Sequence, residues 1–236
     1  MLWPFGKKAR ARRAAEWYGR AMNARQLGDW AEFNRACERG RLADPPKEPP
    51  LNSDFFPFMK EALRPDVATV LDLGCGRLWE EFPTKEDYLL SVFSEAKFKV
   101  TGVDASEHCV EWRRKNGPHG TYLAKDVCEA ARSIQQPFDL VIAHHVIEHL
   151  EKTKGLQLLE DIERIAARQV IIGSPVGFSN NQTSVDRRQN EFERHLSGWL
   201  PEEFVERGYR VLRIYRGAFL VSKDMRPPVF LSGEEK

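Results

Sequence analysis

Apolar runs that alternate with helical patterns constrain the fold of this chain more than any other feature. Beyond residue 50, seven segments are predicted strands: 68–73, 98–103, 121–123, 138–143, 169–173, 210–215 and 218–221. The early runs are continuously apolar, which is typical of a parallel sheet that is covered on both faces. Helical patterns separate them at 84–95, 106–115, 151–167 and 201–207. This order predicts a doubly wound α/β fold, with a seven-stranded Rossmann-like sheet and an antiparallel C-terminal edge hairpin.

The first 50 residues differ from the rest of the chain in charge. Ten basic and four acidic residues lie between Lys7 and Arg41, whereas the whole chain has a net charge of +1, so the remainder is slightly acidic. Helical patterns at 8–27 and 29–40 precede a proline-rich linker at 44–50. We expect a basic N-terminal helical segment with its linker over residues 1–50 and one larger domain over 51–236.

Composition excludes several classes of protein. With 42% hydrophobic and 30% charged residues, the chain is typical of a globular protein, and it has no apolar run of the roughly 18 residues that a membrane span requires. Its four cysteines are scattered without a C-x-x-C pair, which favours a reducing, cytoplasmic location. The acidic body argues against a nucleic-acid partner, although the basic N-terminal segment does not exclude one. Nothing in the sequence indicates an oligomeric state.

The most specific local motif is the glycine turn that follows the first predicted strand, Asp72-Leu73-Gly74-Cys75-Gly76. Glycines at such a turn allow a ligand to approach the backbone closely. The dinucleotide fingerprint requires another glycine three residues after Gly76, where this chain has Trp79. The carboxylate of Asp72 suits a ligand whose nearest end is cationic.

Two further acidic residues follow the next two predicted strands. Asp104 ends the second strand, and Asp126 follows the short third strand. Because the carboxyl ends of parallel strands meet at one edge of the sheet, we expect both to lie beside the glycine turn. A carboxylate at the position of Asp104 can accept hydrogen bonds from both hydroxyls of a ribose, and Asp126 can accept from an adenine amine.

In this order and spacing, residues 66–222 resemble a class I S-adenosylmethionine-dependent methyltransferase. The glycine turn resembles motif I, Asp104 the ribose-binding acid, and Asp126 with Val127 the adenine-binding pair, while Leu78 replaces the third glycine of the usual motif. The resemblance implies that the chain is an enzyme with S-adenosylmethionine as its cofactor. It also implies the following cofactor-binding residues: Asp72, Gly74, Cys75, Gly76, Asp104, Ala105, Asp126, Val127 and His144.

Histidines are the candidate general bases, because methyl transfer requires an aligned nucleophile and, where needed, removal of its proton. We single out His145 and His149, which follow the fourth strand, and His195, which lies on a long polar connection. The primary hypothesis is a metal-independent methyltransferase that acts on a hydroxyl or amine of a small molecule, a sugar or a glycan.

Two alternatives remain open. The i, i+3, i+4 spacing of His145, Glu148 and His149 places them on one helical face, where His195 can complete a metal site. This pattern is similar to that of ubiquinone-pathway and small-RNA O-methyltransferases, except that His145 replaces a glutamate, which disfavours magnesium. Because of that difference we predict no metal ligand. The other alternative is a non-catalytic cofactor-binding interaction protein.

Overall fold

The computed structural model describes residues 56–77, 92–95, 97–178, 181, 190–215 and 217–225, all within one compact unit that spans Pro49–Lys236. The two predicted N-terminal helices, the proline-rich linker, Leu78 and most of the predicted helix 84–95 lie outside the described residues. Within the described part of the chain, every helix is too short or too polar to cross a membrane.

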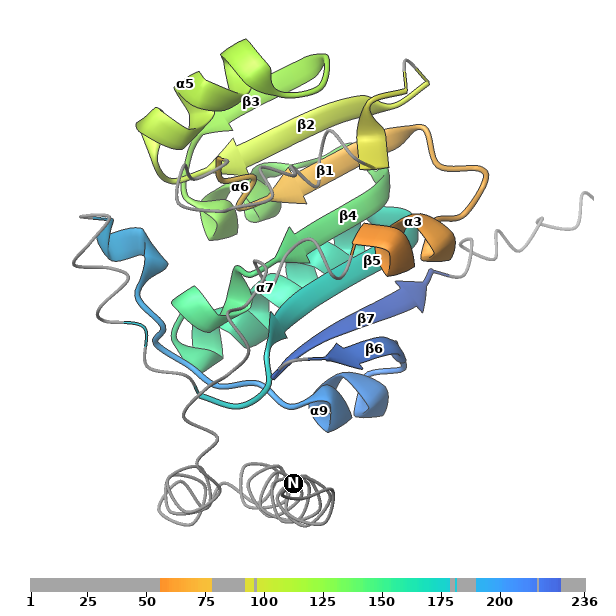
Figure 1. Ribbon diagram of the computed structural model, residues 1–236, viewed down its shortest axis with the longest axis vertical. Coiled ribbons are helices and arrows are strands. Elements are labelled where there is room, and N and C mark those ends of the chain that lie inside the picture. Colours follow the sequence, from red (N-terminus) through yellow and green to blue (C-terminus); the bar gives the residue numbers. More distant parts are fainter. Residues whose placement is uncertain are drawn as a thin grey trace, which may run out of the picture. The chain divides into compact units, whose positions relative to one another are not determined.

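A seven-stranded mixed sheet forms the centre of the fold (Figure 1). Its strands are β1 (Thr69–Leu73), β2 (Lys99–Asp104), β3 (Gly120–Ala124), β4 (Phe138–His144), β5 (Ala166–Pro175), β6 (Arg210–Tyr215) and β7 (Ala218–Asp224). The order is β3-β2-β1-β4-β5-β7-β6, in which the first five strands are parallel, and β7 pairs antiparallel with both β5 and β6. The predicted doubly wound fold and its antiparallel edge hairpin are confirmed.

Helices connect most of these strands. They are α3 (Phe56–Ala62), α5 (Glu107–Asn116), α6 (Val127–Ser133), α7 (Lys152–Ile165) and α9 (Pro201–Glu206), with short 3-10 helices η1 (Ile147–His149) and η2 (Glu191–Glu193). The sequence patterns predicted α5, α7 and α9 but missed α3 and α6. Asp126 begins α6 because its Oδ1 accepts hydrogen bonds from the backbone amides of Cys128 and Glu129.

Two hydrophobic clusters cover the two faces of the sheet. Along β1, Val70 belongs to the cluster that includes side chains of α3 and α5, whereas Leu71 belongs to the cluster beneath α6, α7 and α9. Successive strand residues therefore point into different cores, and both side chains are completely buried. Burial of each contributes about 1.5–3 kcal/mol. This explains why the early strands are continuously apolar.

Charged groups hold together the edge of the sheet at which β1 and β4 begin and next to which β5 runs. We call this edge the amino edge. Asp139 on β4 accepts hydrogen bonds from the backbone amides of Ala68 and Thr69, at 3.0 and 2.9 Å, and from the Thr69 hydroxyl. Arg168 on β5 donates to Asp139 at 2.7 Å and to Asp66 at 2.8 Å. Desolvation raises the pKa of Asp139, but these hydrogen bonds outweigh it and hold the pKa at about 2.

Candidate active site

The opposite, carboxyl edge of the sheet begins with the glycine turn after β1. Gly74 and Gly76 have positive φ values of 73° and 53°, a region that glycine adopts without steric cost. The backbone amides of Gly74 and Cys75 both donate to the carbonyl of Val103 on β2, at 2.7 and 3.0 Å. The turn is therefore joined to the end of the neighbouring strand, and its shape depends on the two glycines.

A buried arginine from α5 holds the other side of this turn. The guanidinium of Arg113, only 2% exposed, donates from Nε and Nη2 to the carbonyl of Cys75 at 2.9 and 2.7 Å, and from Nε to the carbonyl of Gly76 at 3.0 Å. Its planar fork can contact two carbonyls at once. This role could not be predicted from the sequence, because Arg113 lies in a basic run with Arg114 and Lys115.

Asp104 at the end of β2 connects the turn to α5. Its Oδ2 accepts from the backbone amide of Gly76 at 2.8 Å, and its Oδ1 accepts from the amide of Ser106 at 2.8 Å. Burial raises the pKa of Asp104, and the two amides together with Arg113 oppose that shift. A carboxylate has about four lone-pair sites, so each oxygen retains capacity for a further donor such as a ribose hydroxyl.

The glycine turn leaves room for a ligand at one position and none at the other. A Cβ atom added at Gly76 would have only the Gly74 carbonyl nearby, at 3.9 Å, and would otherwise enter open space. A Cβ atom at Gly74 would collide with Cγ2 of Val146, which follows β4. The open face of Gly76 beside Asp104 fits the close backbone approach that the predicted cofactor requires.

The remaining predicted cofactor residues occupy different environments. Asp72 is completely buried, and Cys75, 1% exposed, has a thiol pKa that burial raises far above its usual range. Ala105 is partly buried between Asp104 and Ser106. The exposed side chain of Asp126 caps α6 through Oδ1, and Val127 packs into the core beneath that helix.

His144, the last residue of β4, is also a predicted cofactor contact. Its ring is 5% exposed and packs against Gly173, where an added Cβ atom would collide with it. Burial lowers the pKa of this imidazole well below its ordinary value, and the neighbouring His145 lowers it further. His144 is therefore neutral. Its ring contacts that of His145 edge to face, with the two ring centroids 4.5 Å apart.

His145 has a backbone conformation that is rare for its residue type. Its φ of 58° makes it the one non-glycine residue with positive φ in the described part of the chain. Its Nδ1 lies 2.9 Å from Oε1 of Glu148, and the hydroxyl of Ser174 donates to Oε2 of Glu148 at 3.0 Å. Its Nε2 is buried and has no hydrogen-bond partner among the described residues. Strained residues with unsatisfied polar atoms concentrate at functional sites.

Glu148 is the carboxylate around which this cluster is built. It is 1% exposed. Desolvation raises its pKa, but the hydrogen bond with His145 and the electrostatic influence of the neighbouring His145 and His149 outweigh that effect and lower the pKa to about 2. Glu148 is therefore ionised at neutral pH.

The prediction that His145, Glu148 and His149 share one helical face is wrong, because only Ile147–His149 form a helix, a 3-10 turn.

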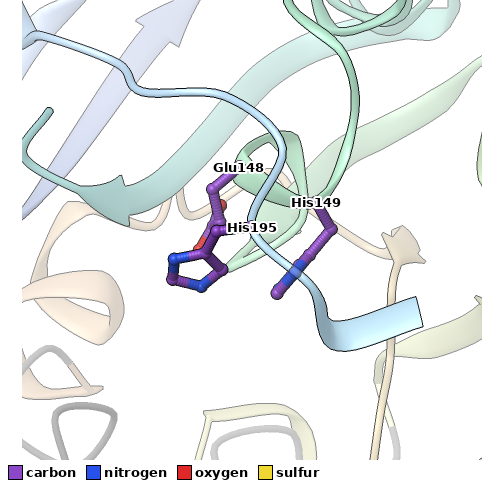
Figure 2. Close-up of side chains that lie close together, drawn as sticks. All are labelled: Glu148, His149 and His195. Carbon is purple, nitrogen blue, oxygen red and sulfur yellow. The ribbon is translucent and has the colours of Figure 1, made fainter. Parts of the chain in front are cut away.

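The structure brings His195 next to this turn from a distant part of the sequence. The rings of His149 and His195 have centroids 4.9 Å apart, and one ligand atom from each of Glu148, His149 and His195 lies within 4.8 Å of the others (Figure 2). The backbone amide of Leu196, the residue after His195, donates to the carbonyl of Glu148 at 2.7 Å, so this segment lies against the turn that follows β4. All three candidate bases thus lie near the carboxyl edge of the sheet.

Comparisons with known proteins agree with this arrangement. A family model described as a methyltransferase domain matches residues 46–171. A search of curated proteins gives no match. Among solved structures, the chain is similar to the N-methyltransferase NodS from Bradyrhizobium japonicum with S-adenosylhomocysteine, with 17% identity, a TM-score of 0.51 and coverage of 78% of this chain and 90% of that one.

A second similar structure is an O-methyltransferase family protein from Burkholderia thailandensis. It shares 14% identity and a TM-score of 0.53 with this chain, and the alignment covers 86% of this chain and 61% of that one. At these identities the two likenesses establish the fold, whereas the family match covers more than half of the sequence.

Proposed function

Because the chain belongs to the methyltransferase domain family and is an S-adenosylmethionine-dependent methyltransferase, we propose that its acceptor is a hydroxyl or amine of a small molecule or sugar. The observation that carries this proposal is the hydrogen-bonded series Ser174–Glu148–His145. Such a series orients a general base, which a neutral hydroxyl or a protonated amine requires before it can attack.

The cofactor is held by the carboxyl edge of the sheet in this proposal. The open face of Gly76 accommodates the approach of the ligand to the backbone, and Asp104 accepts hydrogen bonds from the ribose hydroxyls. When bound, S-adenosylmethionine supplies an activated methyl group on a cationic sulfonium. Val146 packs against Gly74, so the residue next to it, His145, lies beside the turn that holds the cofactor.

His145 acts as the base through its Nε2. Because an ionised carboxylate can only accept a hydrogen bond, Nδ1 of His145 carries the proton that it shares with Glu148, and Nε2 has the lone pair. Nε2 receives the proton of the acceptor hydroxyl or ammonium, and Glu148 stabilises the imidazolium that forms. Ser174 fixes the carboxylate from its other oxygen. His149 and His195 lie beside Glu148 and are further candidates for contact with the acceptor.

The acidic body of the chain supports a small acceptor over a nucleic acid, since phosphate binding requires a basic surface.

We also propose a cytoplasmic location, which agrees with the free thiols of Cys75, Cys109 and Cys128.

Transfer of a labelled methyl group tests the proposal directly. The full-length chain is incubated with S-adenosylmethionine tritiated at its methyl group and with separate pools of hydroxylated small molecules, amines, sugars, RNA and protein. We expect label in an acceptor hydroxyl or amine from the first three pools. His145→Asn, which keeps a residue that tolerates positive φ, should slow the transfer roughly 100-fold or more. Label recovered only in RNA or protein would refute the proposed acceptor class.

A further inference from the structure

The side chains of Glu148, His149 and His195 converge from two segments that are far apart in the sequence (Figure 2). One ligand atom from each lies within 4.8 Å of the other two, a spacing that a single ion can bridge after small side-chain rotations. We propose that these three residues bind a divalent transition-metal ion of the zinc type. This proposal replaces the expectation, drawn from the sequence, that no residue binds a metal. His145, which the sequence spacing also places beside a possible metal site, directs its Nδ1 to Glu148 instead.

The backbone around the three residues is held rigidly, as a metal site requires. The amides of Leu196 and Ser197 both donate to the carbonyl of Glu148, at 2.7 and 3.1 Å. The Ser197 hydroxyl and the indole Nε1 of Trp199 both donate to the carbonyl of Ile147, at 3.1 Å. These four hydrogen bonds fasten the segment that carries His195 onto the 3-10 turn that carries the other two ligands. Little conformational entropy is therefore lost when an ion binds.

Hydrogen bonds to the ligands prepare their atoms for a metal. Nδ1 of His149 lies 3.3 Å from the carbonyl oxygen of Arg194, which can only accept, so Nδ1 carries the proton and Nε2 presents its lone pair. The two oxygens of Glu148 are oriented by His145 and Ser174, and each keeps a further lone pair. Metal-binding histidines and carboxylates characteristically have such supporting partners.

The chemistry of the ligands selects the class of ion. Two imidazoles and one carboxylate form the set that binds zinc and neighbouring transition metals, whereas magnesium and calcium prefer ligands that are all oxygen. Three protein ligands also leave an open coordination position. If the proposed function holds, this position favours an acceptor with an oxygen donor, a hydroxyl rather than an amine, and Nε2 of His145 remains available for its proton.

Zinc titration of the metal-free protein tests the site. The full-length chain is stripped with a chelator, dialysed, and titrated with zinc chloride alone in a calorimeter. We expect one equivalent to bind with micromolar or tighter affinity. Because loss of a residue that only supports a ligand already costs about 10- to 100-fold, we expect His149→Gln and His195→Gln, which remove ligands, each to weaken binding by about 100-fold or more. His108→Gln and His119→Gln, which replace exposed histidines, should bind zinc as the parent does. Millimolar magnesium should not displace the zinc.

Two results would overturn the proposal: the parent binds no zinc, or the His149 and His195 variants bind it as tightly as the two controls do. Circular dichroism of each variant confirms that it is folded. Methyl transfer in the presence of chelator separates this inference from the proposed function. Transfer by a chain that binds no zinc refutes the metal site alone, whereas zinc binding without transfer to any hydroxyl or amine supports the site and refutes the proposed function.

Discussion

At the amino edge of the sheet, Asp139 and Asp66 meet arginines and backbone amides, and the strands begin in ordinary conformations. At the carboxyl edge the same strands end in residues with positive φ, at Gly74, Gly76 and His145, and a buried ring nitrogen of His145 has no partner among the described residues. Both edges contain buried or half-buried charges. At the amino edge these charges pair with one another. At the carboxyl edge they hold the glycine turn and the ring of His145, whose conformation costs folding free energy.

This difference separates stability from function within one sheet. The paired groups at the amino edge lower the free energy of the folded state by satisfying one another. Strained and unpaired groups at the carboxyl edge cost folding free energy, which the two hydrophobic cores offset. Substitutions at the two edges should therefore have opposite signatures: loss of stability with activity retained, or loss of activity with little loss of stability.

The largest effect is expected at His145. In His145→Asn the proposed general base is lost while the backbone keeps a residue that tolerates positive φ, so kcat should fall roughly 100- to 10,000-fold. Affinity for S-adenosylmethionine should change less than about threefold, because the proposed role of His145 is to deprotonate the acceptor. Steady-state kinetics and calorimetry measure the two quantities.

Glu148 is a positioning residue in the same series, and its variants sharpen this prediction. Glu148→Gln should lower kcat strongly with cofactor affinity retained, and Glu148→Asp should recover part of the loss. His108→Asn, on the exposed side of α5, is the matched control. If His145→Asn has the same kcat as this control, the proposed catalytic role of His145 at the carboxyl edge is wrong.

A smaller effect is expected at Arg113, which holds the glycine turn through two carbonyls. Arg113→Lys keeps the charge but loses the planar fork, so affinity for S-adenosylmethionine should fall roughly 10- to 100-fold, and Arg113→Met should lose more. Arg114→Lys, whose guanidinium contacts the carbonyl of Tyr122, should keep the parental affinity. Equal affinities for all three variants would show that the shape of the turn does not depend on Arg113.

The smallest effect is expected at the amino edge. Asp139→Asn should lower the free energy of unfolding by about 1–2 kcal/mol at pH 7 and leave kcat unchanged, because Asp139 has a depressed pKa only when folded. Its stabilising contribution is present above the pKa of the unfolded state, 3.8, and is lost as the pH falls through about 2. Denaturant unfolding of parent and variant from pH 7 down to pH 2 should show the difference shrinking over that range. A difference that grows as the pH falls would contradict the assignment.

The sequence predicted the strands because their signal is local. Continuous apolar runs encode burial on both faces, and the Asp-Leu-Gly-Cys-Gly turn and Asp104 identified the carboxyl edge without a structure. Helix α6 was missed because Asp126 was interpreted only as a ligand contact, although Glu129 three residues later also fits a helix start.

The details of the site depend on contacts between distant residues. Arg113 reaches carbonyls 37 and 38 residues away, and the segment of His195 is hydrogen-bonded to a turn about 50 residues earlier. The positive φ of His145 has no signature in its residue type, and it accompanies a hydrogen bond from its backbone amide to the carbonyl of Gly173 on β5. The sequence therefore identified His145, His149 and His195 as candidates, but the prediction that His145 and His149 lie on one helical face is wrong.

One measurement compares the two edges directly. Calorimetric titration with S-adenosylmethionine is carried out on the parent, on Asp104→Asn and on Asp139→Asn, which are the same substitution at opposite edges of one sheet. Asp104→Asn should bind roughly 10- to 100-fold more weakly, because the ribose loses charge-assisted acceptors and the turn loses the carboxylate that holds Gly76. Asp139→Asn should bind as the parent does. Equal affinities for all three proteins, or a greater loss in Asp139→Asn, would contradict the assignment of the cofactor to the carboxyl edge.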